Sequence, residues 1–163
     1  MFKSYNIRFL ALSICICFAA ISTAFGQGFI ETIEPLPGDI RSDVQGVSPD
    51  GRHLVARSWS NSGIIRSFLW TEGQVVTIFG NLPGSNSGVN AVDASMNGSY
   101  VVGSGINAAG EEEAFRWRAS DNSLTGLGTL VSGTLSRGNS ISDDGQALAG
   151  WANHTFPFTE GWH

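Results

Sequence analysis

The chain has 163 residues, of which 9 are basic and 14 acidic, so its net charge is −5. This acidic balance and the lack of a basic cluster argue against binding to nucleic acid or to an anionic membrane surface. Glycine is abundant at 21 residues, while charged residues make up only 14%. That composition is typical of an all-β protein with many tight turns.

Residues 1–26 have the organisation of a secretory signal peptide. Lys3 and Arg8 give a positive start, an apolar segment follows, and Ala24-Phe25-Gly26 places small residues where a signal peptidase cleaves. We predict cleavage before Gln27, a secreted (extracellular or periplasmic) location, and no membrane insertion of the mature chain. The alternative is an uncleaved anchor, for which the apolar segment is short compared with the roughly 20 residues of a bilayer span.

Both cysteines, Cys15 and Cys17, lie within this segment. The domain that we predict at residues 27–163 therefore has no disulfide, no thiolate metal site and no cysteine nucleophile. A secreted domain without disulfides has to be held together by its hydrophobic core.

One turn sequence occurs three times at a fixed distance. SPDG begins at Ser48, SMNG at Ser95 and SDDG at Ser142, so both the serines and the closing glycines recur every 47 residues. In such a turn serine accepts a backbone hydrogen bond, proline, aspartate and asparagine suit the central positions, and glycine permits a positive φ. Apolar segments flank each turn, which predicts three hairpins.

The strands expected after these turns, at residues 52–56, 99–103 and 146–150, do not alternate cleanly between polar and apolar side chains. This pattern predicts burial on both faces of the strand. A second element carries aromatic residues at the same spacing, and we expect them to fill the space between neighbouring sheets. These residues are Phe68, Trp70, Phe115 and Trp117.

A last element closes each repeat, at residues 78–82 and 126–130, and residues 33–38 are a partial copy of it. The third repeat is compressed, because residues 156–161 match the Phe-Leu-Trp-Thr-Glu-Gly run of the first after a shorter loop. Residues 27–163 are thus predicted to form one β-propeller-like repeat domain. It would comprise the last strand of a missing repeat, two whole repeats and an incomplete third.

A repeat of about 40 to 50 residues is the length of a four-stranded propeller blade. No 10-residue stretch of the sequence shows the periodicity of an amphipathic helix. We therefore predict an all-β fold: four-stranded antiparallel blades of a partial β-propeller, stacked face to face with a period of 47 residues.

The order of these motifs resembles the HAF family of bacterial extracellular repeats. The best copy comprises Ser95-Met96-Asn97-Gly98, Val101-Val102-Gly103, Ala114-Phe115-Arg116-Trp117 and Gly126-Leu127-Gly128-Thr129-Leu130. The His-Ala-Phe triplet that names the family is not matched, since Glu113 precedes Ala114 and the first copy reads Arg66-Ser67-Phe68. The resemblance implies a secreted, bacterial, β-propeller-like repeat domain of undefined activity.

Two groups of acids are candidate sites. Asp50, Asp143 and Asp144 could bind calcium, but a calcium loop needs several oxygens that converge from one short segment, so we interpret them as turn formers. The run Glu111-Glu112-Glu113 could contact a ligand, but such a run is more often a solvated loop tip.

The histidines and serines give no chemical signature. His53, His154 and His163 occupy unrelated positions in the repeat and lack metal-ligand spacing. The turn serines are not in a GxSxG nucleophile elbow. Asn153 begins a glycosylation sequon, which we expect to be unused in a bacterium.

We therefore assign no catalytic, cofactor-binding or metal-ligating residue, and no cofactor. The sequence favours a secreted, non-catalytic binding or structural module and names no partner, while association of several copies into a homo-oligomer is one way in which open blade faces could be buried. One alternative is a fragment of a longer propeller, because two and a half blades do not close a ring. Another is a propeller-type carbohydrate-active enzyme with acids from different blades in one pocket.

Overall fold

The computed structural model describes residues 32–154 and 159–162, which consist of strands joined by turns and loops. The strands are β1 (Asp39–Val47), β2 (His53–Ser60), β3 (Ile65–Thr71), β4 (Gln74–Ile78), β5 (Val89–Ala94), β6 (Tyr100–Ile106), β7 (Glu112–Arg118), β8 (Ser123–Gly126), β9 (Ser136–Ile141), β10 (Leu148–Asn153) and β11 (Thr159–Trp162). No helix in these ranges is long and apolar enough to cross a membrane. The predicted signal peptide and His163 lie outside the described residues.

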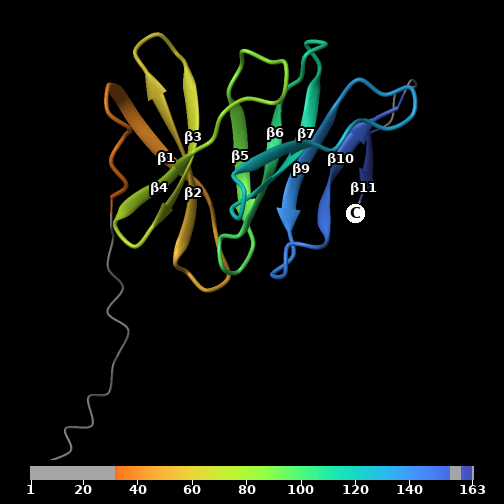
Figure 1. The fold of residues 1–163 in the computed structure, drawn as a ribbon. Coiled ribbons are helices and arrows are strands. Elements are labelled where there is room, and N and C mark those ends of the chain that lie inside the picture. The colour runs from red at the N-terminus through yellow and green to blue at the C-terminus, as the bar shows by residue number, and fades with distance from the viewer. Residues whose placement is uncertain (1–31, 155–158, 163) are drawn as a thin grey trace, which may run out of the picture. The chain divides into compact units, whose positions relative to one another are not determined.

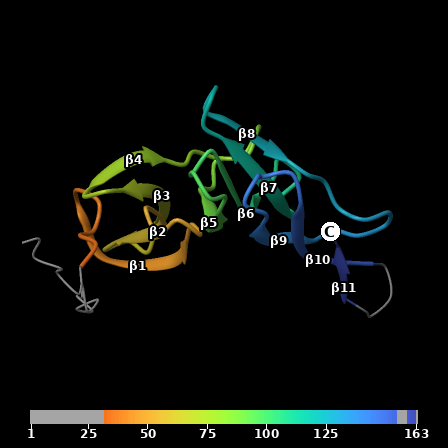
Figure 2. The ribbon, with the colours of Figure 1, turned by 90° about the horizontal axis from the view of Figure 1, so that it is seen from below.

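The strands form three antiparallel sheets that follow one another in chain order (Figures 1 and 2). The first sheet has the order β1-β2-β3-β4, the second β5-β6-β7-β8, and the third β9-β10-β11 with β10 in the middle. Strands adjacent in sequence are adjacent in each sheet, as expected for hairpins. The predicted all-β class and the four-stranded antiparallel sheets are confirmed. The sheets do not close into a ring.

The three predicted turns connect the first two strands of each sheet, and they share one hydrogen-bond pattern. In the first turn the Gly51 amide donates to the Ser48 carbonyl oxygen at 2.8 Å, and the His53 amide donates to Ser48 Oγ at 3.0 Å. The serine hydroxyl accepts the equivalent bond from Tyr100 (3.0 Å) and from Ala147 (2.9 Å). The closing glycines have φ values of 74°, 65° and 73°. The predicted roles of serine and glycine in these turns are confirmed.

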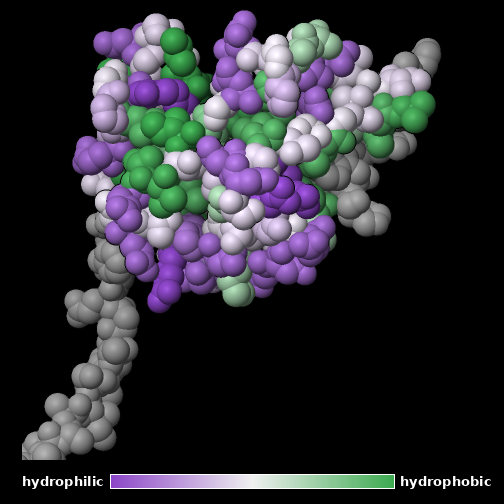
Figure 3. Space-filling view, in the orientation of Figure 1, coloured by the Kyte–Doolittle hydropathy of each residue, from purple (hydrophilic) through white to green (hydrophobic). Residues whose placement is uncertain are grey.

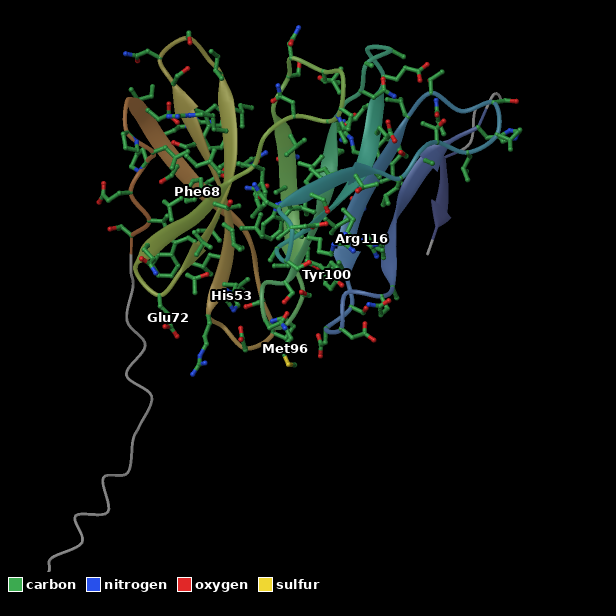
Figure 4. All side chains as sticks on the ribbon, viewed as in Figure 1. His53, Phe68, Glu72, Met96, Tyr100 and Arg116 are labelled. Atoms are coloured by element: carbon green, nitrogen blue, oxygen red, sulfur yellow. The ribbon has the colours of Figure 1, made fainter. Side chains whose placement is uncertain are left out.

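The turn glycines also allow neighbouring sheets to approach each other. A Cβ atom added to Gly98 would lie 2.7 Å from Nδ1 of His53, and one added to Gly145 would overlap the ring of Tyr100. His53 and Tyr100 are 47 residues apart and begin β2 and β6, at the same end of the sheets (Figure 4). A ring from each of the first two sheets therefore rests on the turn glycine of the next sheet.

Each sheet has two faces that can be named by their residues. We call the face that carries Phe68 and Trp70 in the first sheet, and Phe115 and Trp117 in the second, the leading face. Direct cross-strand partners lie on the same face, so Ala56 belongs with Phe68 on the leading face. The opposite face, which carries Val55 and Leu69 in the first sheet and Val102 in the second, is the trailing face.

The main hydrophobic core lies between the trailing face of the first sheet and the leading face of the second. Val55 and Leu69 pack there against Phe115 and Trp117. Phe79 meets Trp117 edge-on, with ring centroids 5.2 Å apart. The prediction that aromatic residues fill the space between sheets is thus confirmed for the second repeat.

The first repeat places its aromatic residues differently. Phe68 is buried, but its neighbours are Leu36 and Ala56 on the leading face of the first sheet, and Trp70 is only partly buried there. The predicted burial of both strand faces holds for β6, where Val101 and Val102 point to opposite faces and are both buried. It is wrong for β10, where Ala149 on the trailing face is exposed because no described sheet covers it.

The closing elements of the repeats differ from the prediction. The fourth strands end at Ile78 and Gly126, where the predicted elements 78–82 and 126–130 begin. The chain there leaves the sheet edge and crosses to the next sheet, and Phe79 and Leu82 turn into the core on the way. Gly128, with a φ of 81°, marks the equivalent bend after β8.

The N-terminal partial copy is also not a strand. Residues 32–36 pair with no strand, although the Leu36 side chain is buried and its amide donates to Ser58 Oγ at 2.9 Å. A strand needs a paired neighbour for its backbone groups, and this segment packs on a face of the first sheet rather than along an edge. The compressed third copy is described only from Thr159, where β11 pairs with β10. Residues 155–158 lie outside the described ranges.

Replacing Gly98 by alanine is expected to lower the free energy of unfolding by more than the same change at Gly51. Both glycines have a positive φ, so each alanine carries about 1–2 kcal/mol of backbone strain. Only at Gly98 does the new methyl group meet another side chain, His53, because a Cβ at Gly51 has nothing within 4 Å. Urea unfolding of the two variants measures the difference, and equal losses would contradict the role of Gly98 in sheet packing.

Candidate functional site

Polar side chains connect the first and second sheets at their first strands. Arg57, on β2, donates from Nη2 to Asp43 Oδ2 on β1 at 3.0 Å. Its Nη1 donates to Asn90 Oδ1 on β5, in the next sheet, at 3.2 Å. The guanidinium therefore donates a hydrogen bond to an acceptor in each of the two sheets. Its planar group of several N–H donors is well suited to this role.

An aromatic ring lies beside this contact. The guanidinium carbons of Arg41 and Arg57 lie 4.2 Å and 5.0 Å from the ring centroid of Trp59. Both distances are within the range of cation–π attraction, so the ring helps to hold both guanidinium groups in position. The cluster presents cationic and apolar surface side by side next to the first junction between sheets.

The second and third sheets are joined by carboxylates. Asp93 Oδ2, on β5, accepts from the Ile141 amide at 2.9 Å and from Ser140 Oγ at 3.0 Å, both on β9. Glu112 Oε2, on β7, lies 2.6 Å from Nη2 of Arg137 on β9. These bonds tie the first strand of the third sheet to two strands of the second.

The sequence predicts that the acidic run Glu111-Glu112-Glu113 is a solvated loop tip. This prediction is wrong for Glu112 and Glu113. Strand β7 begins at Glu112, which also accepts from Ser104 Oγ at 2.8 Å. Glu113 accepts from Asn107 Nδ2 at 3.1 Å and from the Gly128 amide at 2.8 Å. Both carboxylates hold neighbouring segments in place, which composition alone does not reveal.

The turn acids Asp50 and Asp144 act locally. Ser48 Oγ donates to Asp50 at 2.5 Å, and Ser142 Oγ donates to Asp144 at 2.6 Å. These hydroxyl bonds, together with a backbone amide bond to each carboxylate, lower the pKa of both acids. Their interpretation as turn formers fits this geometry. The described residues contain no cluster of three or more His, Cys, Asp or Glu side chains placed to hold a metal ion.

A polar groove lies near the second and third turns. It has a volume of about 430 Å³, and its lining includes Tyr100, Arg118, Asp143 and Asp144. The Arg118 guanidinium pairs with Asp121 at 2.5 Å and holds the pKa of that carboxyl well below its usual range. The groove offers hydroxyl, carboxylate and guanidinium groups that can hydrogen-bond to a small polar molecule.

The histidines and the sequon asparagine also lie at structural contacts. His53 Nδ1 is 2.8 Å from Thr71 Oγ1, which fixes the ring that faces the next sheet. Asn153 Oδ1 accepts from the Thr134 and Leu135 amides at 2.8 and 2.7 Å, so it fastens the loop before β9. His154 follows β10, and His163 lies outside the described residues.

Sequence reasoning missed Arg57 and Asp93 as connectors between sheets. For Asp93 the signal is a departure from the repeat, because Asp93 corresponds to Gly46 in the first copy and to Ser140 in the third. A charged residue at a position that is otherwise small is a candidate for a bond specific to one junction.

No protein-family model matches the chain, and no curated protein matches it. Among solved structures, the chain is similar to TolB from Acinetobacter baumannii, a β-propeller protein, with a TM-score of 0.51 and 18% sequence identity. The match covers 71% of this chain and 28% of the TolB chain. At this identity the likeness shows the fold alone, so the described sheets have a β-propeller-like arrangement.

Replacing Asp93 by alanine is expected to lower the free energy of unfolding by about 1–3 kcal/mol, because the Ile141 amide loses its acceptor between two sheets. Asp121→Ala is the matched control, since the bonds of Asp121 stay within one hairpin and its side chain is half exposed. We expect the control to lose clearly less stability, because ion pairs of exposed side chains contribute little. Urea unfolding tests this, and similar losses in both variants would show that Asp93 is not a special connector.

The variant Asp144→Asn is expected to weaken the acid sensitivity of folding. The folded-state pKa of Asp144 is lowered from 3.8, so the carboxylate stabilises the fold above that value, and this contribution is lost as the pH falls through the folded pKa. Asparagine fits the turn, because Asn97 occupies the equivalent position. Melting temperatures from pH 2.5 to 7 should therefore fall less steeply below about pH 4 in the variant. Parallel curves would contradict the role of the carboxylate.

Proposed function

We propose that this chain is an exported repeat protein that acts as a non-catalytic binding or structural module. Its units are HAF-type propeller blades with a period of 47 residues. The identical turn hydrogen bonds at Ser48, Ser95 and Ser142 support this period. The signal-peptide pattern of residues 1–26 supports export, to the periplasm or the cell exterior.

The observation that carries the proposal is the use of the carboxylates between strands and sheets. Asp43, Asp93 and Glu112 each bond to a partner on another strand, and the latter two bond across a junction between sheets. A glycosidase needs two carboxyl groups that flank one scissile bond, one as acid and one as base or nucleophile. Acids that hold the scaffold instead favour a module whose role is to present surfaces.

The likeness to TolB supports a place within a larger propeller. The match spans 28% of the TolB chain, and closed propellers contain about four to eight blades. Three sheets would be completed either by further repeats in the same polypeptide or by association. In both cases the module contributes blades to an assembly, and its exposed groove and loops are available to a partner.

The test compares the chain from Gln27 to His163 with its variant Asp143→Asn on a panel of polysaccharides and peptides. Asp143 lines the polar groove, where an enzyme would place its chemistry. We expect neither protein to release reducing ends or peptide fragments above the buffer control. Turnover that the single acid-to-amide change abolishes would overturn the proposal and establish an enzyme. Asp50→Asn serves as a control, since Asp50 lies in the first turn and does not line the groove, and Asn97 fills the equivalent position of the second turn.

A further inference from the structure

The leading face of the first sheet exposes apolar side chains whose equivalents are buried in the second sheet. Val44 and Val47 are 46% and 52% exposed, whereas Ala91 and Ala94, 47 residues later, are 0% and 1% exposed. Cross-strand pairing connects Val47 to Val75 and Val44 to Ile78 over the four strands of this face. Val75 and Ile78, on β4, are 44% and 47% exposed. Figure 3 shows hydrophobic surface, in green, over the first sheet. A contiguous apolar patch of this kind marks a surface for another protein.

Among the described residues, the leading faces of the second and third sheets are each covered by the trailing face of the sheet before them. At the first junction the trailing face of the first sheet covers Ala91, Ala94 and the rings behind them. At the second junction a Cβ added to Gly138, on the leading side of β9, would overlap Val102 on the trailing face of the second sheet. The natural cover of a leading face is thus the trailing face of a preceding sheet.

The segment before β1 is part of the same arrangement. The Leu36 amide bonds to Ser58 on the first sheet, and Leu36 is buried there. On the second sheet, a Cβ added to Gly105, 47 residues after Ser58, would lie 3.3 Å from Leu82 Cδ1. Leu36 therefore occupies on the first sheet the place that Leu82 occupies inside the first junction. The leading face of the first sheet therefore has the same arrangement as the leading face inside a junction between sheets.

We propose that a second copy of this chain supplies the other half, by packing the trailing face of its third sheet on the leading face of the first sheet. That trailing face carries Ala149, which is exposed, and Trp151, which is partly buried. At the second junction Gly138 lies opposite Val102. Val44 is the equivalent of Gly138 in the first sheet, and Ala149 is the equivalent of Val102 in the third. Val44 of one copy would therefore lie opposite Ala149 of the other. The inference goes beyond the proposed function, because it names the partner and the contact.

Two such contacts close the assembly. If each copy offers its third sheet to the first sheet of the other, the three sheets of each copy combine into a ring of six. Six blades lie within the range of closed propellers, and head-to-tail contacts that close form rings rather than fibres. The turns also fit this contact. Gly98 and Gly145 each meet a ring of the preceding sheet, whereas Gly51 has open space at that place. In the third sheet the position equivalent to those rings holds the small Ala147.

The first test is the solution mass of the chain from Gln27 to His163, which contains the compact unit Thr32–His163. Light scattering after size exclusion should give the mass of a dimer. Val44→Glu places a charge in the contact and should halve that mass without unfolding, because Val44 is already exposed in one copy. The control Val131→Glu changes a loop residue that is 85% exposed and should leave the dimer intact.

The second test fixes the orientation. Residues 27–163 contain no cysteine, so Val44→Cys and Ala149→Cys can be made as single-cysteine proteins. Mixed and oxidised, they should form a disulfide between position 44 of one copy and position 149 of the other. A disulfide only between two Val44→Cys chains would overturn the head-to-tail contact in favour of face-to-face packing. A monomer, or aggregate without a discrete mass, would overturn the second copy as the partner. Neither readout depends on whether the protein is an enzyme.

Discussion

The contact between a ring of one sheet and the turn glycine of the next is the constraint on which the rest of the structure depends. His53 rests on Gly98 and Tyr100 rests on Gly145, and neither contact leaves room for a Cβ atom. This sets how closely consecutive sheets approach at one end. The hydrophobic core, with Phe115 and Trp117 between the first two sheets, forms at that spacing. The polar bonds between sheets, such as that of Asp93 to β9, also rely on it.

The sequence was sufficient to predict what depends on local chemistry. Turns such as Ser48 to Gly51 form from their own residues, so class, turn positions and the four-stranded sheets could be predicted. The bonds of Asp93 and Glu112 could not, because their partners on β9 lie more than 20 residues away and the repeat does not conserve them in type. Residues 33–36 copy a closing element, but they lack the paired neighbour that a strand requires, so sequence similarity alone gave the wrong structure.

The same physical logic connects the fold to its proposed role. The polar network on the sheets stabilises their stacking, and the acids within it are held by scaffold partners such as Arg57 and Arg137. What the stacking leaves over is one apolar leading face on the first sheet, centred on Phe68. Under the proposed function the module uses this face to complete an assembly, and the polar groove beside Tyr100 carries groups that can hydrogen-bond to a small ligand.

The central claim, that ring-on-glycine contacts set the spacing of the sheets, is tested most directly by a double-mutant cycle between His53→Ala and Gly98→Ala. Removal of the ring should make room for the new methyl group. Gly98→Ala should therefore destabilise the His53→Ala protein by at least about 1 kcal/mol less than it destabilises the natural protein. Additive losses in urea unfolding would contradict the claim, because they would show that Gly98 is needed for its backbone conformation alone.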